Sequence, residues 1–201
     1  MYRPFSFTLA HGFILAAAAL FPMTAPTRYQ PTEPVGTLIS GTLSFTGHAT
    51  VGGEFVGRTS TVAGEFTGDL LNPTGWVESP VATLSTRNSQ RDRDMRASLE
   101  AGRYPMMRLD VCGATVVASQ PARGDTLEML LHGRLSIHGV TRAVDVPALV
   151  VTTAKGIDVT AAFPLDLADY DVGGLTKMFG LLRMERRIDV TAKLRFVTVD
   201  R

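Results

Sequence analysis

Histidine is the side chain that most often transfers protons or binds metals near neutral pH, and this chain has four of them. His11 lies in the apolar N-terminal segment, and His48 stands apart from the others. His132 and His138 fall on one face of a predicted strand, but six residues at about 3.3 Å each separate them by about 20 Å. Two side chains that far apart cannot bind the same metal ion. The pattern therefore favours surface or turn histidines over a metal or catalytic site.

Other groups that commonly carry catalysis are also sparse. A single cysteine, Cys112, excludes an intrachain disulfide and any multi-cysteine metal site. Its neighbours Val111 and Gly113 favour a packed thiol over an activated nucleophile. The sequence has no Gly-x-Ser-x-Gly elbow, no Gly-x-Gly-x-x-Gly fingerprint and no Gly-x-x-x-x-Gly-Lys loop. We predict no catalytic residues, no cofactor and no metal, and hence a protein that is not an enzyme.

Arginine is concentrated in one stretch, which holds more basic than acidic side chains. These are Arg87, Arg91, Arg93, Arg96, Arg103 and Arg108 against Asp92, Asp94 and Glu100. The excess can attract an anionic headgroup or a phosphate. The alternative, which we favour, is a solvated helix face with ion pairs worth about 0.3–0.5 kcal/mol each. The whole chain has 20 basic and 19 acidic residues, so we expect no nucleic acid among its partners.

The arginine-rich stretch is predicted to form a helix. Ser89 is a suitable N-cap, Asp92 lies in the first turn, and Gly102 can close the C-terminus. Met95 and Leu99 are spaced i, i+4 and share one face of such a helix.

A second helix or lid is predicted over residues 173–182. Its apolar residues at helical spacing are Leu175, Met178, Phe179 and Leu182, with glycines on either side.

Most of the remaining chain alternates apolar and polar residues with period two, which predicts half-buried strands. Segments 77–85 and 144–153 are also read as strands, giving about eight in all. The alternating apolar faces are Ile39, Leu43 and Phe45; Val62, Gly64, Phe66 and Leu70; Met107, Leu109 and Val111; Leu127, Met129, Leu131, Gly133, Leu135 and Ile137; Ile157, Val159, Ala161, Phe163 and Leu165; and Ile188, Val190, Ala192, Leu194 and Phe196.

Short turns separate these runs, which favours antiparallel neighbours. Turn residues occur at 72–75, 120–124, 138–139 and 155–156. Long strands with one apolar face suit a closed barrel, because closure removes exposed sheet edges. We therefore predict an all-β fold, an extended antiparallel barrel of eight strands with one or two short helices.

The apolar faces either fill such a barrel or line a cavity for one small ligand. Small residues at Gly41, Gly64, Gly68, Gly133 and Ala161 leave volume inside, although glycines also serve barrel corners. If the barrel is hollow, the predicted lining residues are Phe45, Phe66, Met95, Leu99, Leu109, Met129, Leu131, Leu135, Ile137, Phe163, Met178 and Leu194.

The first 25 residues have the pattern of a signal peptide. Arg3 is their only charged residue apart from histidine, and an uncharged apolar run follows over residues 12–21. That run is too short to span about 30 Å of hydrocarbon. Cleavage near Ala25 predicts an exported protein, periplasmic or extracellular. Pro26 disfavours cleavage there, so an uncleaved anchor or a misassigned start codon is the alternative.

The remaining domain boundaries follow from composition. Residues 26–35 are polar and Pro-rich and predict a linker, which leaves residues 36–201 as one domain. No other segment approaches about 18 consecutive apolar residues, so we expect no membrane span in the mature chain.

Two stretches resemble the YceI-like family. Residues 85–110, STRNSQRDRDMRASLEAGRYPMMRLD, match its Arg-Asp helix followed by Tyr-Pro and a strand. Residues 131–146, LHGRLSIHGVTRAVDV, match its Ile-His-Gly-Val-Thr strand–turn–strand. The resemblance covers roughly residues 36–199.

The resemblance implies a lipocalin-like barrel, usually exported, whose tunnel holds a polyisoprenoid or similar lipid without catalysis. It gives Arg91 and Asp92 the role of holding the helix at the barrel mouth. Gly139 is expected to accept the turn geometry of the second motif, and Thr141 and His138 to hydrogen-bond across that turn. This chain departs from the family in LADYDVGG, where Leu167 replaces an expected Arg and Asp171 an expected Gly.

Two functional hypotheses follow. The first is an exported protein that holds a polyisoprenoid-class lipid, gated by Met95, Leu99 and residues 175–182. The alternative is an envelope stress or interaction protein with a filled barrel and no ligand. The oligomeric state is left open, with a homodimer as one outcome.

Overall fold

The computed structural model describes residues 36–50, 53–68, 71–120, 126–173, 176–177 and 182–198. Its strands are β1 (Gly36–Ala49), β2 (Gly53–Thr59), β3 (Ala63–Thr67), β4 (Thr74–Pro80), β5 (Met106–Gln120), β6 (Thr126–Ile137), β7 (Val140–Thr153), β8 (Gly156–Asp166), β9 (Thr176–Lys177), β10 (Leu182–Arg183) and β11 (Arg187–Thr198). The helical segments are α1 (Ser89–Ser98) and the 3₁₀ turns η1 (Val81–Thr83) and η2 (Leu167–Tyr170).

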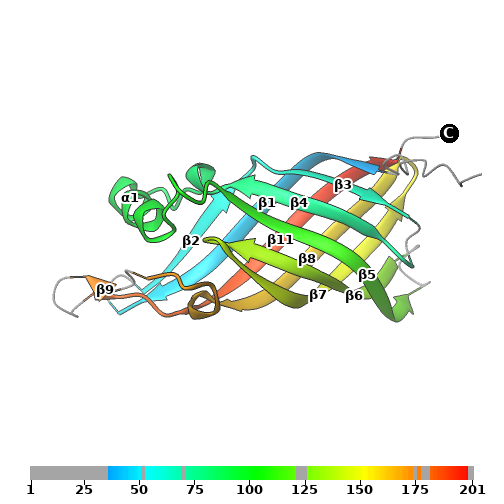
Figure 1. Cartoon of the computed structure of the whole chain (residues 1–201). Helices are drawn as coiled ribbons and strands as arrows, with labels where there is room; N and C mark the ends of the chain where they lie inside the picture. The colour runs from blue at the N-terminus through cyan, green and yellow to red at the C-terminus, as the bar shows by residue number, and fades with distance from the viewer. Residues whose placement is uncertain are drawn as a thin grey trace, which may run out of the picture. The chain divides into compact units, whose positions relative to one another are not determined.

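Eight of the strands close into an antiparallel barrel, as the alternation predicted (Figure 1). The ring runs β1-β11-β8-β7-β6-β5-β4-β3 and returns to β1. Closure rests on β1 and β11, which pair from Gly36↔Thr198 to Thr46↔Asp189. On its other side β1 pairs first with β3 and then, from Leu43 onward, with β2.

Along β6, β8 and β11, the inward-facing residues are those of the predicted apolar faces. On β6, Met129, Leu135 and Ile137 are buried, whereas Arg134 between them is exposed. The same alternation holds along β8 and β11. The two-residue repeat of a strand therefore sets which side chains enter the barrel.

The prediction for the start of β1 is wrong. Ile39 is 60% exposed, and Leu38 packs against the core instead. The pairing of β1 with β11 shifts between Leu38 and Ser40. Such a bulge adds one residue to the strand and reverses the alternation on one side of it.

Cys112 also departs from its prediction, because its thiol is exposed rather than packed. The register of β5 against β6 shifts between Val111 and Gly113, which places Cys112 at a second bulge. There its Sγ lies 3.3 Å from the backbone oxygen of His132, to which it donates a weak hydrogen bond.

The glycines inside the barrel do not create empty volume. A Cβ on Gly64 would lie 2.8 Å from the backbone oxygen of Trp76, and one on Gly133 2.5 Å from that of Asp110. These positions lack a side chain because neighbouring strands approach closely. Of the small residues proposed to leave room, only Ala161 lines the cavity described below.

Helix α1 forms where predicted, but its ends differ by one to two residues. The N-cap is Asn88 rather than Ser89, and its side-chain oxygen accepts the Arg91 N–H at 3.0 Å. At the other end the left-handed residue is Glu100, with φ 43°, rather than Gly102. Asn88 has the extended backbone that an N-cap requires. Glu100 has the left-handed backbone that commonly follows the last turn of a helix.

The helix predicted over residues 173–182 is wrong in the part that can be compared. Thr176–Lys177 and Leu182–Arg183 pair as the short antiparallel strands β9 and β10. Leu175, Met178 and Phe179 lie outside the described residues.

A buried carboxylate fixes α1 to the barrel. Asp92 is 7% exposed and accepts hydrogen bonds from the backbone N–H and the hydroxyl of Thr86, at 2.7 and 2.6 Å. The Ser85 hydroxyl donates a third at 3.0 Å. Ser85 itself bridges to Arg58 of β2, so the helix is tied through this segment to the barrel wall.

Burial acts to raise the pKa of Asp92, but the bonds from Thr86 and Ser85, with the charge of Arg96, outweigh it. The pKa is therefore lowered from its ordinary value of 3.8. A lowered folded-state pKa means that this stabilisation is fully present above pH 3.8 and is lost as the pH falls through the lower folded value.

Replacing Asp92 tests this anchor. We expect Asp92→Asn to lower the free energy of unfolding by about 1–3 kcal/mol at pH 7, because the buried donors of Thr86 and Ser85 lose charge-assisted hydrogen bonds to the carboxylate. Its stability should also fall less steeply than that of the wild type below pH 3.8. Urea unfolding at several pH values measures both, with exposed Asp189→Asn as control. Equal acid sensitivity of Asp92→Asn and wild type would contradict the anchor.

Candidate ligand-binding site

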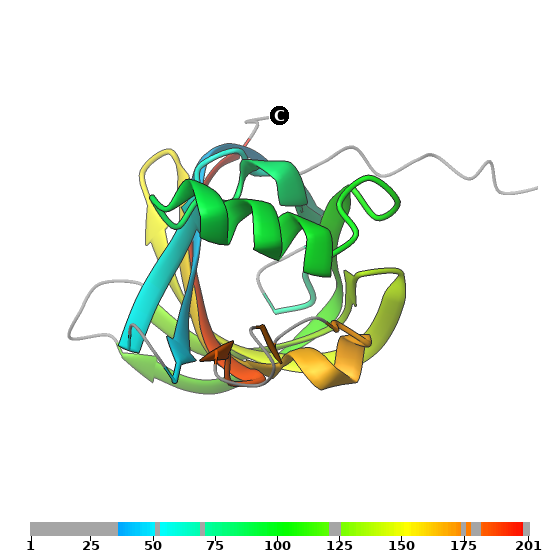
Figure 2. The same ribbon diagram turned by 90° about the vertical axis from the view of Figure 1, so that its left-hand side faces the viewer.

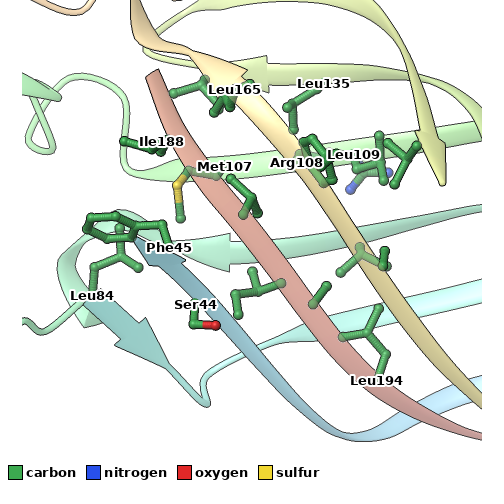
Figure 3. Close-up of a pocket in the computed structure, with 18 of the residues that line it drawn as sticks. Ser44, Phe45, Leu84, Met107, Arg108, Leu109, Leu135, Leu165, Ile188 and Leu194 are labelled. Atoms are coloured by element: carbon green, nitrogen blue, oxygen red, sulfur yellow. The ribbon is translucent and has the colours of Figure 1, made fainter. Parts of the chain in front are cut away.

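The barrel is hollow. A cavity of about 520 Å³ lies inside it, within the range of about 300–1,000 Å³ typical of ligand pockets. Side chains from several strands surround it, among them Phe45, Leu135 and Leu194 (Figure 3). A volume of this size distinguishes a binding barrel from a filled one.

Nearly every residue predicted to line a tunnel lies in the wall of this cavity. Met178 lies outside the described residues. Those in the wall are Phe45, Phe66, Met95, Leu99, Leu109, Met129, Leu131, Leu135, Ile137, Phe163 and Leu194. Their contact with a ligand stays a prediction, since the structure gives their positions only.

The strands contribute mainly apolar side chains to the cavity, while α1 contributes several polar ones beside Met95. Figure 2 looks onto the end of the barrel that α1 crosses, with η2 on the opposite rim. Along one side of α1 the wall includes Asn88, Gln90, Arg91, Asp94 and Ser98. The cavity therefore has an apolar interior and a polar end, which suits a ligand with a long apolar part.

Some wall residues were missed by the sequence reasoning. Phe55 was missed because no strand was predicted over β2, whose glycines obscure the alternation. Its ring packs edge-on against Phe45, with centroids 6.2 Å apart. Leu167 and Val172 were missed because they lie in and after η2, where no two-residue repeat exists.

The two departures from the family pattern have different consequences. Leu167 is buried and lines the cavity, so an apolar side chain occupies the place of the expected Arg. Asp171 has φ 53°, the left-handed region that the expected Gly would also favour. Aspartate tolerates this conformation better than most residues.

His138 joins three elements at the α1 end. Its Nδ1 donates to the backbone oxygen of Tyr170 at 3.0 Å, and its Nε2 lies 3.4 Å from Oε1 of Glu100. Its ring packs edge-on against Tyr104, with centroids 5.1 Å apart. Of the two residues predicted to bond across the β6–β7 turn, Thr141 does so, with its hydroxyl 2.8 Å from that of Ser136, whereas His138 contacts Tyr170 and Glu100. His138 is therefore a turn histidine that connects this turn to α1 and η2.

His132 has a different environment on the outer face of the barrel. It lies between Asp145 and Thr115, at 2.8 Å from each. None of these three residues lines the cavity. Within the described ranges, no three His, Cys, Asp or Glu side chains are grouped so as to hold a metal ion.

A closed antiparallel barrel with one apolar internal cavity is the architecture of a lipocalin-like binding protein. The family model for the YceI-like domain matches residues 38–196, most of the 201-residue chain. The chain therefore belongs to the YceI-like family, whose members are binding proteins. None of the curated proteins matches this sequence.

Solved structures share the fold at low sequence identity. A polyisoprenoid binding domain from Saccharophagus degradans, implicated in plant cell wall breakdown, has a TM-score of 0.69 at 18% identity, over 83% of this chain and 99% of that one. BcnA from Burkholderia cenocepacia gives 0.63 at 14% identity, covering 79% and 96%. A Campylobacter jejuni YceI protein gives 0.57 at 17% identity, covering 72% and 85%.

In the described part of the chain, no helix is both long and apolar enough to cross a membrane.

Paired tryptophan substitutions test the cavity wall. Leu135 faces the cavity and Arg134, one position away, faces out. We expect Leu135→Trp to abolish binding of the apolar dye N-phenyl-1-naphthylamine, and Arg134→Trp to leave it unchanged, because successive side chains point to opposite faces. Fluorescence titration measures the binding.

Thermal unfolding of the same two variants tests whether the barrel is hollow. A filled barrel would lose about 1–3 kcal/mol through overpacking by the indole of Leu135→Trp. A hollow one should accept it with a smaller loss. In the dye titration, loss of binding in Arg134→Trp but not in Leu135→Trp would show that Arg134, rather than Leu135, faces the cavity.

Proposed function

We propose that this protein is exported and binds one long apolar or amphiphilic lipid of the polyisoprenoid class inside its barrel, without catalysing a reaction. The observation that carries the proposal is the cavity of about 520 Å³ with its largely apolar wall. Burial of apolar surface contributes about 25 cal/mol per Å². A chain of methyl and methylene groups gains most from such a wall.

The shape of the barrel favours a long ligand over a compact one. Apolar wall residues extend from Leu165 and Ile188 near one end of β8 and β11 to Ile157 and Phe196 near the other. The nine residues from 157 to 165 correspond to roughly 25–30 Å of strand at about 3.3 Å per residue. A linear or isoprenoid chain matches an elongated cavity of this kind.

A structural relative supports the same ligand class. The Saccharophagus degradans domain with this fold is a polyisoprenoid binding domain. At 18% identity the likeness carries the fold, and the ligand class is our extension of it to this chain. The alternative of a filled barrel without ligand is disfavoured by the open volume inside.

Export is proposed from the sequence of the first 25 residues, with their apolar run and the small residues before position 26. We expect the mature protein in the periplasm or outside the cell, beginning near Pro26. Amino-terminal sequencing of protein recovered from the cell envelope and medium measures this. A chain that still begins with Met1 would contradict cleavage and favour an anchor.

Native mass spectrometry of the protein purified from its own host tests the ligand. We expect a mass excess that disappears on organic extraction, with an isoprenoid chain identified in the extract. As control, the Leu135→Trp variant purified in the same way should lack it, and Arg134→Trp should retain it. A wild-type protein that carries no lipid and takes up none from added isoprenoid alcohols would contradict the proposed function.

A further inference from the structure

One cation of the cavity wall has no carboxylate partner, and it lies at the polar end. Arg91 of α1 lines the cavity, and its guanidinium carbon lies 4.3 Å from the centroid of the Phe55 ring. Among the residues that the structure describes, no carboxylate lies within ion-pair distance of it. Arg91 is also only partly exposed, so its charge is less screened than that of a surface arginine.

The other arginine of the wall shows the contrast. Arg108 is paired with Glu78 at 2.9 Å and with Asp110 at 2.8 Å, and its guanidinium lies over the ring of Trp76. Its charge is satisfied within the protein. Among the described residues, the guanidinium of Arg91 contacts the Phe55 ring and no carboxylate. The ring orients the group, and its N–H donors can bind another acceptor.

The Phe55 ring that contacts Arg91 belongs to the apolar wall of the cavity. Phe55 packs edge-on against Phe45, and both rings line the cavity. A ligand chain lying against these rings would therefore end close to the guanidinium. The acidic residue of the wall, Asp94, lies one turn along α1, and its carboxylate accepts a hydrogen bond from Gln90 at 3.4 Å.

We infer that Arg91 binds the anionic headgroup, a carboxylate or a phosphate, of an amphiphile whose apolar chain lies in the barrel. A guanidinium offers two parallel N–H donors that match both groups. The inference rests on the proposed function and deepens it, because it gives the ligand an orientation: chain inside, charged head at α1. It also assigns one residue of the arginine-rich stretch a binding role that a solvated helix face would not have.

Matched amphiphiles test this inference on the protein purified from its own host and freed of lipid. The probes are geranylgeranyl phosphate against geranylgeraniol, and palmitate against hexadecanol. Each pair shares one apolar chain and differs in the head. We expect the wild type to bind at least one anion about tenfold more tightly than its alcohol, as charge-assisted hydrogen bonds of a partly buried group do. The pair that shows the preference identifies phosphate or carboxylate as the head.

Substitutions of Arg91 then locate the preference. Arg91→Gln should abolish the preference, because the affinity for the anion falls about tenfold more than the affinity for the alcohol, and Arg91→Lys should retain part of it. Arg93→Gln is the matched control. It removes the same charge two positions along α1, about 200° around the helix, from a residue that does not line the cavity. It should keep the full preference.

The outcomes separate this inference from the proposed function. Equal binding of alcohol and anion by the wild type, or an unchanged preference in Arg91→Gln, would overturn the role of Arg91 and leave lipid binding intact. Equal loss in Arg91→Gln and Arg93→Gln would also overturn it, because the helix charge in general would then be responsible. Failure of the wild type to bind any of the four probes would overturn the proposed function itself.

Discussion

The pairing of β1 with β11 is the constraint on which the rest of this structure depends. Ten residue pairs between Gly36↔Thr198 and Thr46↔Asp189 join strands from opposite ends of the domain and close the sheet. Once the sheet is closed, one face of every strand points into the barrel, toward the other strands. Period-two alternation then places a continuous apolar surface inside, and the barrel diameter set by eight strands leaves room for a ligand.

The second constraint acts at one end of the barrel. Asp92 ties α1 to the segment after η1 through buried hydrogen bonds, and His138 ties the end of α1 to η2 and to the β6–β7 turn. These contacts hold a polar helix against an apolar cavity. The same helix therefore serves two purposes: Met95 and Leu99 extend the apolar wall, while Arg91 supplies a charge at its edge. This arrangement places a polar end beside an apolar interior, as the proposed amphiphilic ligand requires.

Most of the predictions that failed were decided by pairing between strands. Ile39 and Cys112 lie at bulges, where one extra residue reverses which face a side chain occupies. Residues 173–182 have apolar side chains at helical spacing, yet the described pieces of that segment pair as strands. Gly64 and Gly133 have no side chain because a neighbouring strand passes close by. At the bulges and the two glycines, a contact with a residue distant in the sequence decided the outcome, and the local pattern does not contain that contact. In residues 173–182, the pairing of Leu182 with Lys177 outweighed the helical spacing.

The sequence by itself determined the fold class, the antiparallel order of its strands, the presence of α1 and the inward faces of β6, β8 and β11. These follow from periodicity, turn residues and capping, which act over a few neighbouring residues. Only the tertiary structure decided that the barrel is hollow, that Phe55 and Leu167 belong to its wall, and that Arg91 lies over an aromatic ring with no carboxylate partner among the described residues. The volume of the cavity and the ion pairs of a charged side chain both depend on residues that are far apart in the chain. They become defined only when closure brings those residues together.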